Sequence, residues 1–267
     1  MCNYMGHRVT KQQYIRLKQI EKQFGIAAAL EVLKSGFEYG DWAVIVPNED
    51  KTNFDIKMMH WEFIPNYINS IEDLKLVRKG INPRTKERQA AIPWLNAKSE
   101  NLLINSSGKK AMWADAARKK RCLVLATHFF EWRHYKPHDS KKEFTYPYLI
   151  DFYNEDEPMY MAGIYNTWTD KVTGETMDTF AIVTTEANEL MSIIHNSKKR
   201  QPTILTEDLA YEWLMNDLTD ERILEIAKYQ LPSDFMIAHT IDRDFRTNPD
   251  PLQPFDYYEL PDLDLAT

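Results

Sequence analysis

The chain has 267 residues, of which 43% are hydrophobic and 27% are charged, and its net charge at pH 7 is −7. A chain of this size can fold as one domain over residues 1–267 without a metal or a disulfide, with the tail after about residue 245 peripheral. The acidic balance argues against an indiscriminate nucleic-acid binder, and since we find neither a secretory signal nor an apolar run long enough to cross a membrane, we expect a cytoplasmic protein.

The first half of the chain predicts helices and strands in irregular alternation. Thr10 can cap a helix whose apolar residues recur on one face up to Phe24, and a second helical stretch follows as far as Leu33. Two strands and a helix that Gly80 ends are then predicted at residues 42–46, 54–65 and 71–79.

The second half is richer in strands. A largely apolar run at residues 121–126 predicts a buried strand, and further strands are predicted at 146–150, 159–165, 180–184 and 235–241. Helices are predicted at 187–194, 207–216 and 220–229. This density of strands predicts an α+β fold in which helices surround one curved, largely antiparallel, barrel-like sheet.

Cys2 occupies a position that gives a cysteine additional chemistry. Removal of Met1 would leave Cys2 with a free amine beside its thiol. Such a 1,2-aminothiol can attack an aldehyde through nitrogen to form a Schiff base, and sulfur can then close a five-membered thiazolidine ring. The ordinary pKa values are about 8 for the amine and about 8.5 for the thiol, so both need activation by a neighbouring base or by desolvation.

Three other segments carry groups that could assist this chemistry. Glu131 follows an apolar strand among aromatic residues, where desolvation would raise its pKa, although a surface carboxylate would look the same in the sequence. His195 ends a helical stretch and can exchange protons near pH 7, although such a histidine more often stabilises the helix dipole. The segment from Asn96 to Glu100 starts a predicted helix, and it could hold a phosphate or the N-terminal amine or act as an ordinary cap.

The order of these segments resembles the SOS-response-associated peptidase (SRAP) family of abasic-site-processing proteins. The resemblance runs from Cys2 to about Leu205. It rests on Met-Cys at the start, Asn-Ala-Lys-Ser-Glu at 96–100, Arg-Cys at 121–122 leading to Phe-Glu-Trp at 130–132, Ala-Gly-Ile-Tyr at 162–165, Thr-Thr-Glu-Ala-Asn at 184–188, and His195 with Arg-Gln-Pro at 200–202. It implies a protein that binds single-stranded DNA at an abasic site and forms a covalent, thiazolidine-linked complex through its N-terminal cysteine.

The same resemblance implies a role for each residue of a candidate catalytic site. Cys2 is the nucleophile, and Asn96 orients the amine or the DNA. Glu131 is the acid–base carboxylate, and His195 assists proton transfer at the sugar. The resemblance also implies self-removal of Met1, a monomer without a cofactor, and association with the nucleoid when DNA is bound.

Several side chains could bind the DNA. Lys98 stands where the family usually has Arg, which keeps the charge but loses the bidentate fork. Three consecutive cations in a loop longer than the family's shortest form could hold phosphate: Lys198, Lys199 and Arg200. Trp61 and Phe129 could stack on bases, although core packing is the simpler account of each. Trp61 is followed by Glu62, where the family usually has Gly.

Three alternatives remain open on the sequence alone. Cys122 with a histidine could form a cysteine hydrolase, although a buried thiol in a strand usually acts as a small apolar side chain. A noncovalent single-strand-binding module would use only the basic clusters and the aromatic residues. A zinc site from His128, His134 and His138 lacks a well-placed cysteine pair, so we expect no metal.

Overall fold

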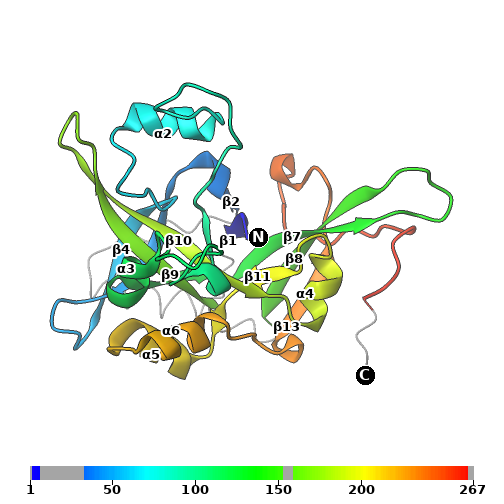
Figure 1. Ribbon diagram of the computed structural model, residues 1–267. Coiled ribbons are helices and arrows are strands. Elements are labelled where there is room, and N and C mark those ends of the chain that lie inside the picture. The colour runs from blue at the N-terminus through cyan, green and yellow to red at the C-terminus, as the bar shows by residue number, and fades with distance from the viewer. Residues whose placement is uncertain (1, 7–32, 153–158, 264–267) are drawn as a thin grey trace.

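The computed structural model describes residues 2–6, 33–152 and 159–263 (Figure 1). The two helical stretches predicted between Thr10 and Leu33 lie outside these residues, apart from Leu33 itself. The described strands form two sheets. Within the described part of the chain, no helix is long and apolar enough to cross a membrane.

The larger sheet contains a closed barrel of five strands. Its strands are β3 (Asp41–Pro47), β4 (Phe54–Trp61), β5 (Asn96–Lys98), β6 (Arg121–Ala126), β9 (Met159–Thr169), β10 (Thr176–Glu186), β11 (Arg200–Pro202) and β12 (Ile204–Leu205). The barrel runs β10, β4, β3, β6, β9, and a second pairing of β9 with β10 closes it. Among the described strands of this sheet, only the pairings of β10 with β4 and with β5 are parallel. The predicted barrel-like, largely antiparallel sheet is confirmed.

Strand β6 is buried along its whole length because it lies between two cores. Leu123 and Leu125 contribute to one apolar cluster, and Cys122 and Val124 contribute to the other. Opposite Cys122 on β9 stands Gly163, where a Cβ atom would lie 2.7 Å from the Cys122 sulfur. A residue without a side chain therefore lets the two strands approach.

A second sheet, which the sequence did not predict, holds the N-terminus. It runs β13 (Met236–Thr240), β8 (Phe144–Phe152), β7 (His128–Tyr135), β1 (Tyr4–Gly6) and β2 (Lys34–Ser35), and every pairing is antiparallel. Met5 pairs with Phe129, and Tyr4 pairs with Ser35. The first residues of the chain are thus fixed between two strands.

Helices surround the barrel, as the α+β prediction requires. They are α2 (Ile71–Arg78), α3 (Ala114–Lys119), α4 (Glu189–Ile194), α5 (Glu207–Met215) and α6 (Asp220–Ala227), with short 3-10 helices at Gly36–Glu38, Ser99–Asn101, Ser233–Phe235 and Phe245–Thr247. In Figure 1, α2 lies at the top and α5 and α6 lie at the bottom. Side-chain oxygens of Ser70, Asn188, Thr206 and Thr219 accept a first-turn backbone N–H, which explains where these helices begin.

The structure corrects three local predictions. The strand predicted at 54–65 ends at Trp61, and the next residue, Glu62, is buried and pairs with Arg78. Asn96–Lys98 forms a strand rather than a helix start, because it pairs with β10. Glu131 does not follow a strand but lies within β7.

Candidate functional site

Cys2 precedes strand β1 and is fully buried. Its sulfur lies 3.7 Å from the carbonyl oxygen of Tyr4. The backbone N–H of Gly36 donates to the carbonyl oxygen of Asn3 at 2.9 Å, which fixes the chain next to the cysteine. The thiol is therefore held at a defined point inside the protein.

Asn96 ties this segment to the barrel. Its side-chain nitrogen donates to the side-chain oxygen of Asn3 at 3.0 Å. Its own oxygen, Oδ1, is buried and has no hydrogen-bond partner among the described residues. A buried amide oxygen without a donor is costly, so this atom favours an N–H ligand nearby. Asn3 is a contact that the sequence analysis missed, although its position beside Cys2 could have indicated it.

Glu131 and His195, the two predicted acid–base residues, lie next to each other. The carboxylate oxygen Oε2 of Glu131 lies 3.7 Å from Nδ1 of His195, and both side chains are almost completely buried. Nδ1 also lies 2.8 Å from the carbonyl oxygen of Arg200. Because a carbonyl can only accept, Nδ1 carries the proton and Nε2 is the acceptor nitrogen.

Burial sets the protonation of these groups. Burial raises the pKa of Glu131 to about 7, although the positive charge of Lys198 opposes the rise. Burial lowers the pKa of His195 to about 4, and Lys198 adds to the effect. Burial also raises the pKa of the Cys2 thiol, and the negative charge of Glu131 raises it further. At neutral pH the site thus holds a neutral imidazole, a neutral thiol and a carboxyl group close to half protonated.

Lys98, Lys198 and Lys199 are exposed, as phosphate binding requires. Lys98 is the last residue of β5, two positions after Asn96. The loop that carries the other two is fixed by Asn196, whose side chain accepts from the backbone N–H of His134 at 3.0 Å and donates to its carbonyl oxygen at 2.7 Å. This clamp is a tertiary contact for which the sequence holds no signal.

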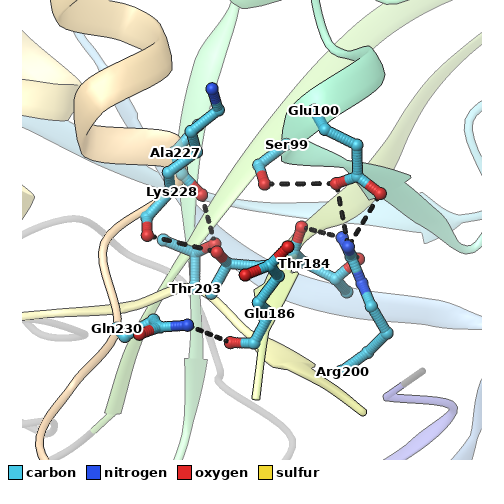
Figure 2. Close-up of polar contacts among 10 residues, drawn as sticks. Ser99, Glu100, Thr184, Glu186, Arg200, Thr203, Ala227, Lys228 and Gln230 are labelled. Atoms are coloured by element: carbon cyan, nitrogen blue, oxygen red, sulfur yellow. Dashed lines mark hydrogen bonds and ion pairs between the residues drawn. The ribbon is translucent and has the colours of Figure 1, made fainter. Parts of the chain in front are cut away.

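Arg200 departs from its predicted role. It is buried, and its guanidinium binds both carboxylate oxygens of Glu100 at 2.8 Å as well as the backbone and side-chain oxygens of Thr184. Figure 2 shows Glu100 and Thr184 meeting at this guanidinium. Through these contacts Arg200 connects β11 to β10 and to the segment after β5. Its guanidinium is therefore used in structural contacts and not exposed for the predicted phosphate contact.

The two predicted stacking residues are core residues. Trp61 and Phe129 are both 0% exposed, so neither ring offers a face to a base. Trp61 donates its ring N–H to the carbonyl oxygen of Leu95 and stacks against Phe180 at 6.2 Å. Both residues are therefore part of the core, which is the simpler of the two explanations that the sequence allowed.

The residues of the alternative sites have other surroundings. Cys122 is buried inside the barrel, and burial raises the pKa of its thiol. The three histidines of the zinc alternative contact separate partners: His128 contacts Thr127, His134 contacts Glu143 and His138 contacts Asp139. Across residues 2–6, 33–152 and 159–263, no three His, Cys, Asp or Glu side chains are grouped to hold a metal.

Comparison with known proteins gives consistent matches. A family model described as SOS response associated peptidase (SRAP) matches residues 7–247. The abasic site processing protein YoqW of Bacillus subtilis (strain 168) is 30% identical over 161 residues, which cover 60% of this chain and 65% of YoqW. The abasic site processing protein HMCES of Gallus gallus is 28% identical over 201 residues, which cover 68% of this chain and 51% of HMCES. Less than two thirds of each named relative is therefore matched.

A solved structure supports the fold. The crystal structure of a protein from Bacteroides thetaiotaomicron is 27% identical and has a TM-score of 0.70, over 95% of this chain and 100% of that one.

Proposed function

The chain belongs to the SOS response associated peptidase (SRAP) family, and on this basis we propose that it processes abasic sites in single-stranded DNA. The processing is capture of the lesion as a covalent crosslink to Cys2, once Met1 has been removed. The observation that supports the proposal most is that the buried Cys2 thiol lies near enough to Glu131 to feel its charge, while the Glu131 carboxylate lies 3.7 Å from His195.

The reaction begins at the aldehyde of the opened deoxyribose ring. His195, which is neutral at pH 7, accepts the proton of the anomeric hydroxyl and passes it to the ring oxygen, so that the ring C–O bond breaks and the aldehyde forms. The α-amine of Cys2 then attacks the aldehyde carbon to give a carbinolamine. The buried oxygen of Asn96 accepts an N–H from this amine and so directs its lone pair toward the carbon.

Glu131 serves in the next two steps. Its protonated carboxyl group donates a proton to the carbinolamine hydroxyl, which leaves as water and gives a Schiff base. The Schiff base formed in this way is protonated, so when the thiol of Cys2 adds to the imine carbon its proton passes to the Glu131 carboxylate and regenerates the carboxyl group. The net change is aldehyde plus aminothiol giving thiazolidine plus one water. A pKa of about 7 suits a group that must both donate and accept.

The DNA backbone binds beside this site. Lys98, Lys198 and Lys199 offer exposed charges to phosphates. A noncovalent single-strand-binding protein is the main alternative, and it would use the same cations.

Intact mass spectrometry of the protein with an abasic single-stranded oligonucleotide tests the proposal. We expect loss of Met1 and a heat-stable adduct that an intact-base strand does not give. Cys2→Ala keeps an amine but loses the thiol, so its adduct should form only when borohydride traps the Schiff base.

Cys122→Ala is the matched control, because it removes the other buried cysteine, and it should keep the heat-stable adduct. A protein without Met1 that gives no adduct on the abasic strand would refute capture and leave noncovalent binding.

A further inference from the structure

Residues 78–89 form a cationic hairpin between α2 and β5. It holds five basic residues, Arg78, Lys79, Arg84, Lys86 and Arg88, against one acid, in a chain with a net charge of −7. All but Arg78 are exposed, and among the described residues these four exposed cations form no ion pair. A concentration of unneutralised positive charge on an acidic protein favours an anionic partner.

The hairpin is an ordered structure. Ile81 and Arg88 form an antiparallel bridge, and the backbone N–H of Gln89 donates to the carbonyl oxygen of Gly80 at 2.9 Å. Gly80 has a φ of 69°, and a Cβ atom on it would lie 2.6 Å from the backbone carbonyl oxygen of Gln89. The turn therefore requires glycine. At the tip, the side-chain oxygen of Asn82 accepts two backbone N–H groups. The exposed cations therefore stand on a fixed scaffold.

A pocket of about 430 Å³ lies between this hairpin, α2 and the segment that leads into β5. Tyr67, which is 54% exposed, packs edge-on against Trp94 with ring centroids 6.1 Å apart. Ile92 adds an exposed apolar wall, and Asn82 and Gln89 add amide groups. Aromatic and apolar walls with a few hydrogen-bonding groups suit a flat heterocycle such as a nucleobase.

The pocket is connected to the catalytic site by a short rigid segment. Trp94 precedes Asn96 by two residues, which span at most about 7 Å of extended chain. The carbonyl oxygen of Trp94 accepts from Phe63, and that of Leu95 accepts from Ile182, both at 3.0 Å. The pocket and Asn96 are therefore held at a short and fixed separation along the chain, which suits a DNA strand that contacts both.

We propose that the cationic hairpin and the Tyr67 pocket form a second DNA subsite, in which the hairpin holds phosphates that flank the lesion and the pocket takes an unpaired base. This inference rests on the proposed function, since it assumes that the ligand at Asn96 is single-stranded DNA. It assigns the pocket to bases next to the abasic position, which itself has no base.

Fluorescence anisotropy with an intact single strand of roughly 15 nucleotides tests the hairpin, since strands of this length fill single-strand sites. The variant is Arg84→Glu/Lys86→Glu/Arg88→Glu. Each phosphate contact contributes about −0.7 to the slope of log affinity against log salt. Between about 50 and 200 mM salt the affinity of the unmodified protein should fall about 20-fold more than that of the variant, if three contacts are lost.

The matched control is Lys136→Glu/Lys141→Glu/Lys142→Glu, which makes the same charge change with three exposed lysines near the turn between β7 and β8. It should keep the salt dependence of the unmodified protein. A control that loses as much as the hairpin variant would show that net charge alone matters, and would overturn the subsite.

Tyr67 tests the pocket separately. Tyr67→Ala should weaken binding about fivefold or more, whereas Tyr67→Phe keeps the ring and should keep the affinity. Equal affinity of Tyr67→Ala and the unmodified protein would refute base binding in the pocket.

The intact strand separates this inference from the proposed function. If the unmodified protein forms no adduct with abasic DNA, the proposed function fails, whatever the hairpin variants do. If it forms the adduct while the hairpin variant binds intact strands as well as the unmodified protein, only the subsite fails.

Discussion

Glu131→Gln should have opposite effects on stability and on lesion capture. Burial raises the pKa of this carboxyl from its ordinary 4.5 to about 7. At about 1.4 kcal/mol for each pKa unit, ionising Glu131 in the folded protein costs about 3 kcal/mol more than in the unfolded chain. Glutamine has nearly the same shape as the protonated carboxyl and never ionises.

The sign of the pH dependence follows from linkage. The folded protein holds a proton on Glu131 that the unfolded chain releases near its ordinary pKa of 4.5. The stability from this proton is complete below that pH and is lost as the pH rises through about 7. Relative to its value at low pH, the free energy of unfolding of the unmodified protein is therefore lowered by under about 1 kcal/mol at about pH 5 and by about 3 kcal/mol above about pH 8. The glutamine variant should gain this difference.

Urea unfolding of both proteins at about pH 5 and pH 9 measures this change, and adduct formation measures the catalytic effect. Loss of the proton donor should slow the formation of the thiazolidine about 10²- to 10⁴-fold. If the stability difference between the two proteins does not change with pH, the carboxyl is not held protonated by burial. If Glu131→Gln forms the adduct as fast as the unmodified protein, Glu131 is not the proton donor.

Three further predictions follow from contacts in the fold and the site. Gly163→Ala should destabilise the protein by about 1–3 kcal/mol in urea unfolding, because its new Cβ meets the Cys122 sulfur. The loss should be smaller in a Cys122→Ala background, and equal losses in both backgrounds would contradict this steric explanation. Arg78→Ala should cost about 3 kcal/mol or more in thermal unfolding because it leaves the buried Glu62 carboxylate unpaired, and adding Glu62→Gln should restore most of that loss. Asn96→Ala should lower the free energy of unfolding by about 1 kcal/mol, because it removes the hydrogen bond to Asn3. It should also slow adduct formation at saturating DNA while the affinity for an intact strand stays the same, and rate and binding assays together check this.

The sequence was sufficient for features that depend on neighbours along the chain. The run Cys122–Ala126 is apolar throughout and lies in the buried strand β6. Ser70 and Gly80 bound α2 through a side-chain cap and a positive φ, both of which are local properties of these residues. The adjacency of Met1 and Cys2 is enough to predict aminothiol chemistry after removal of Met1, because that prediction depends only on covalent bonding.

Tertiary structure alone decided which side chains are buried and what they contact. Asn96 resembles a helix start in the sequence, but pairing with β10, some 85 residues away, makes it a strand. Arg200 looks like a free cation until Glu100 is brought to it. Trp61 has the same aromatic ring whether it faces solvent or the core, and only the packed fold excludes it from the surface. The pKa of Glu131 likewise depends on desolvation by residues distant in the chain, since burial is a property of the assembled structure and not of any local pattern.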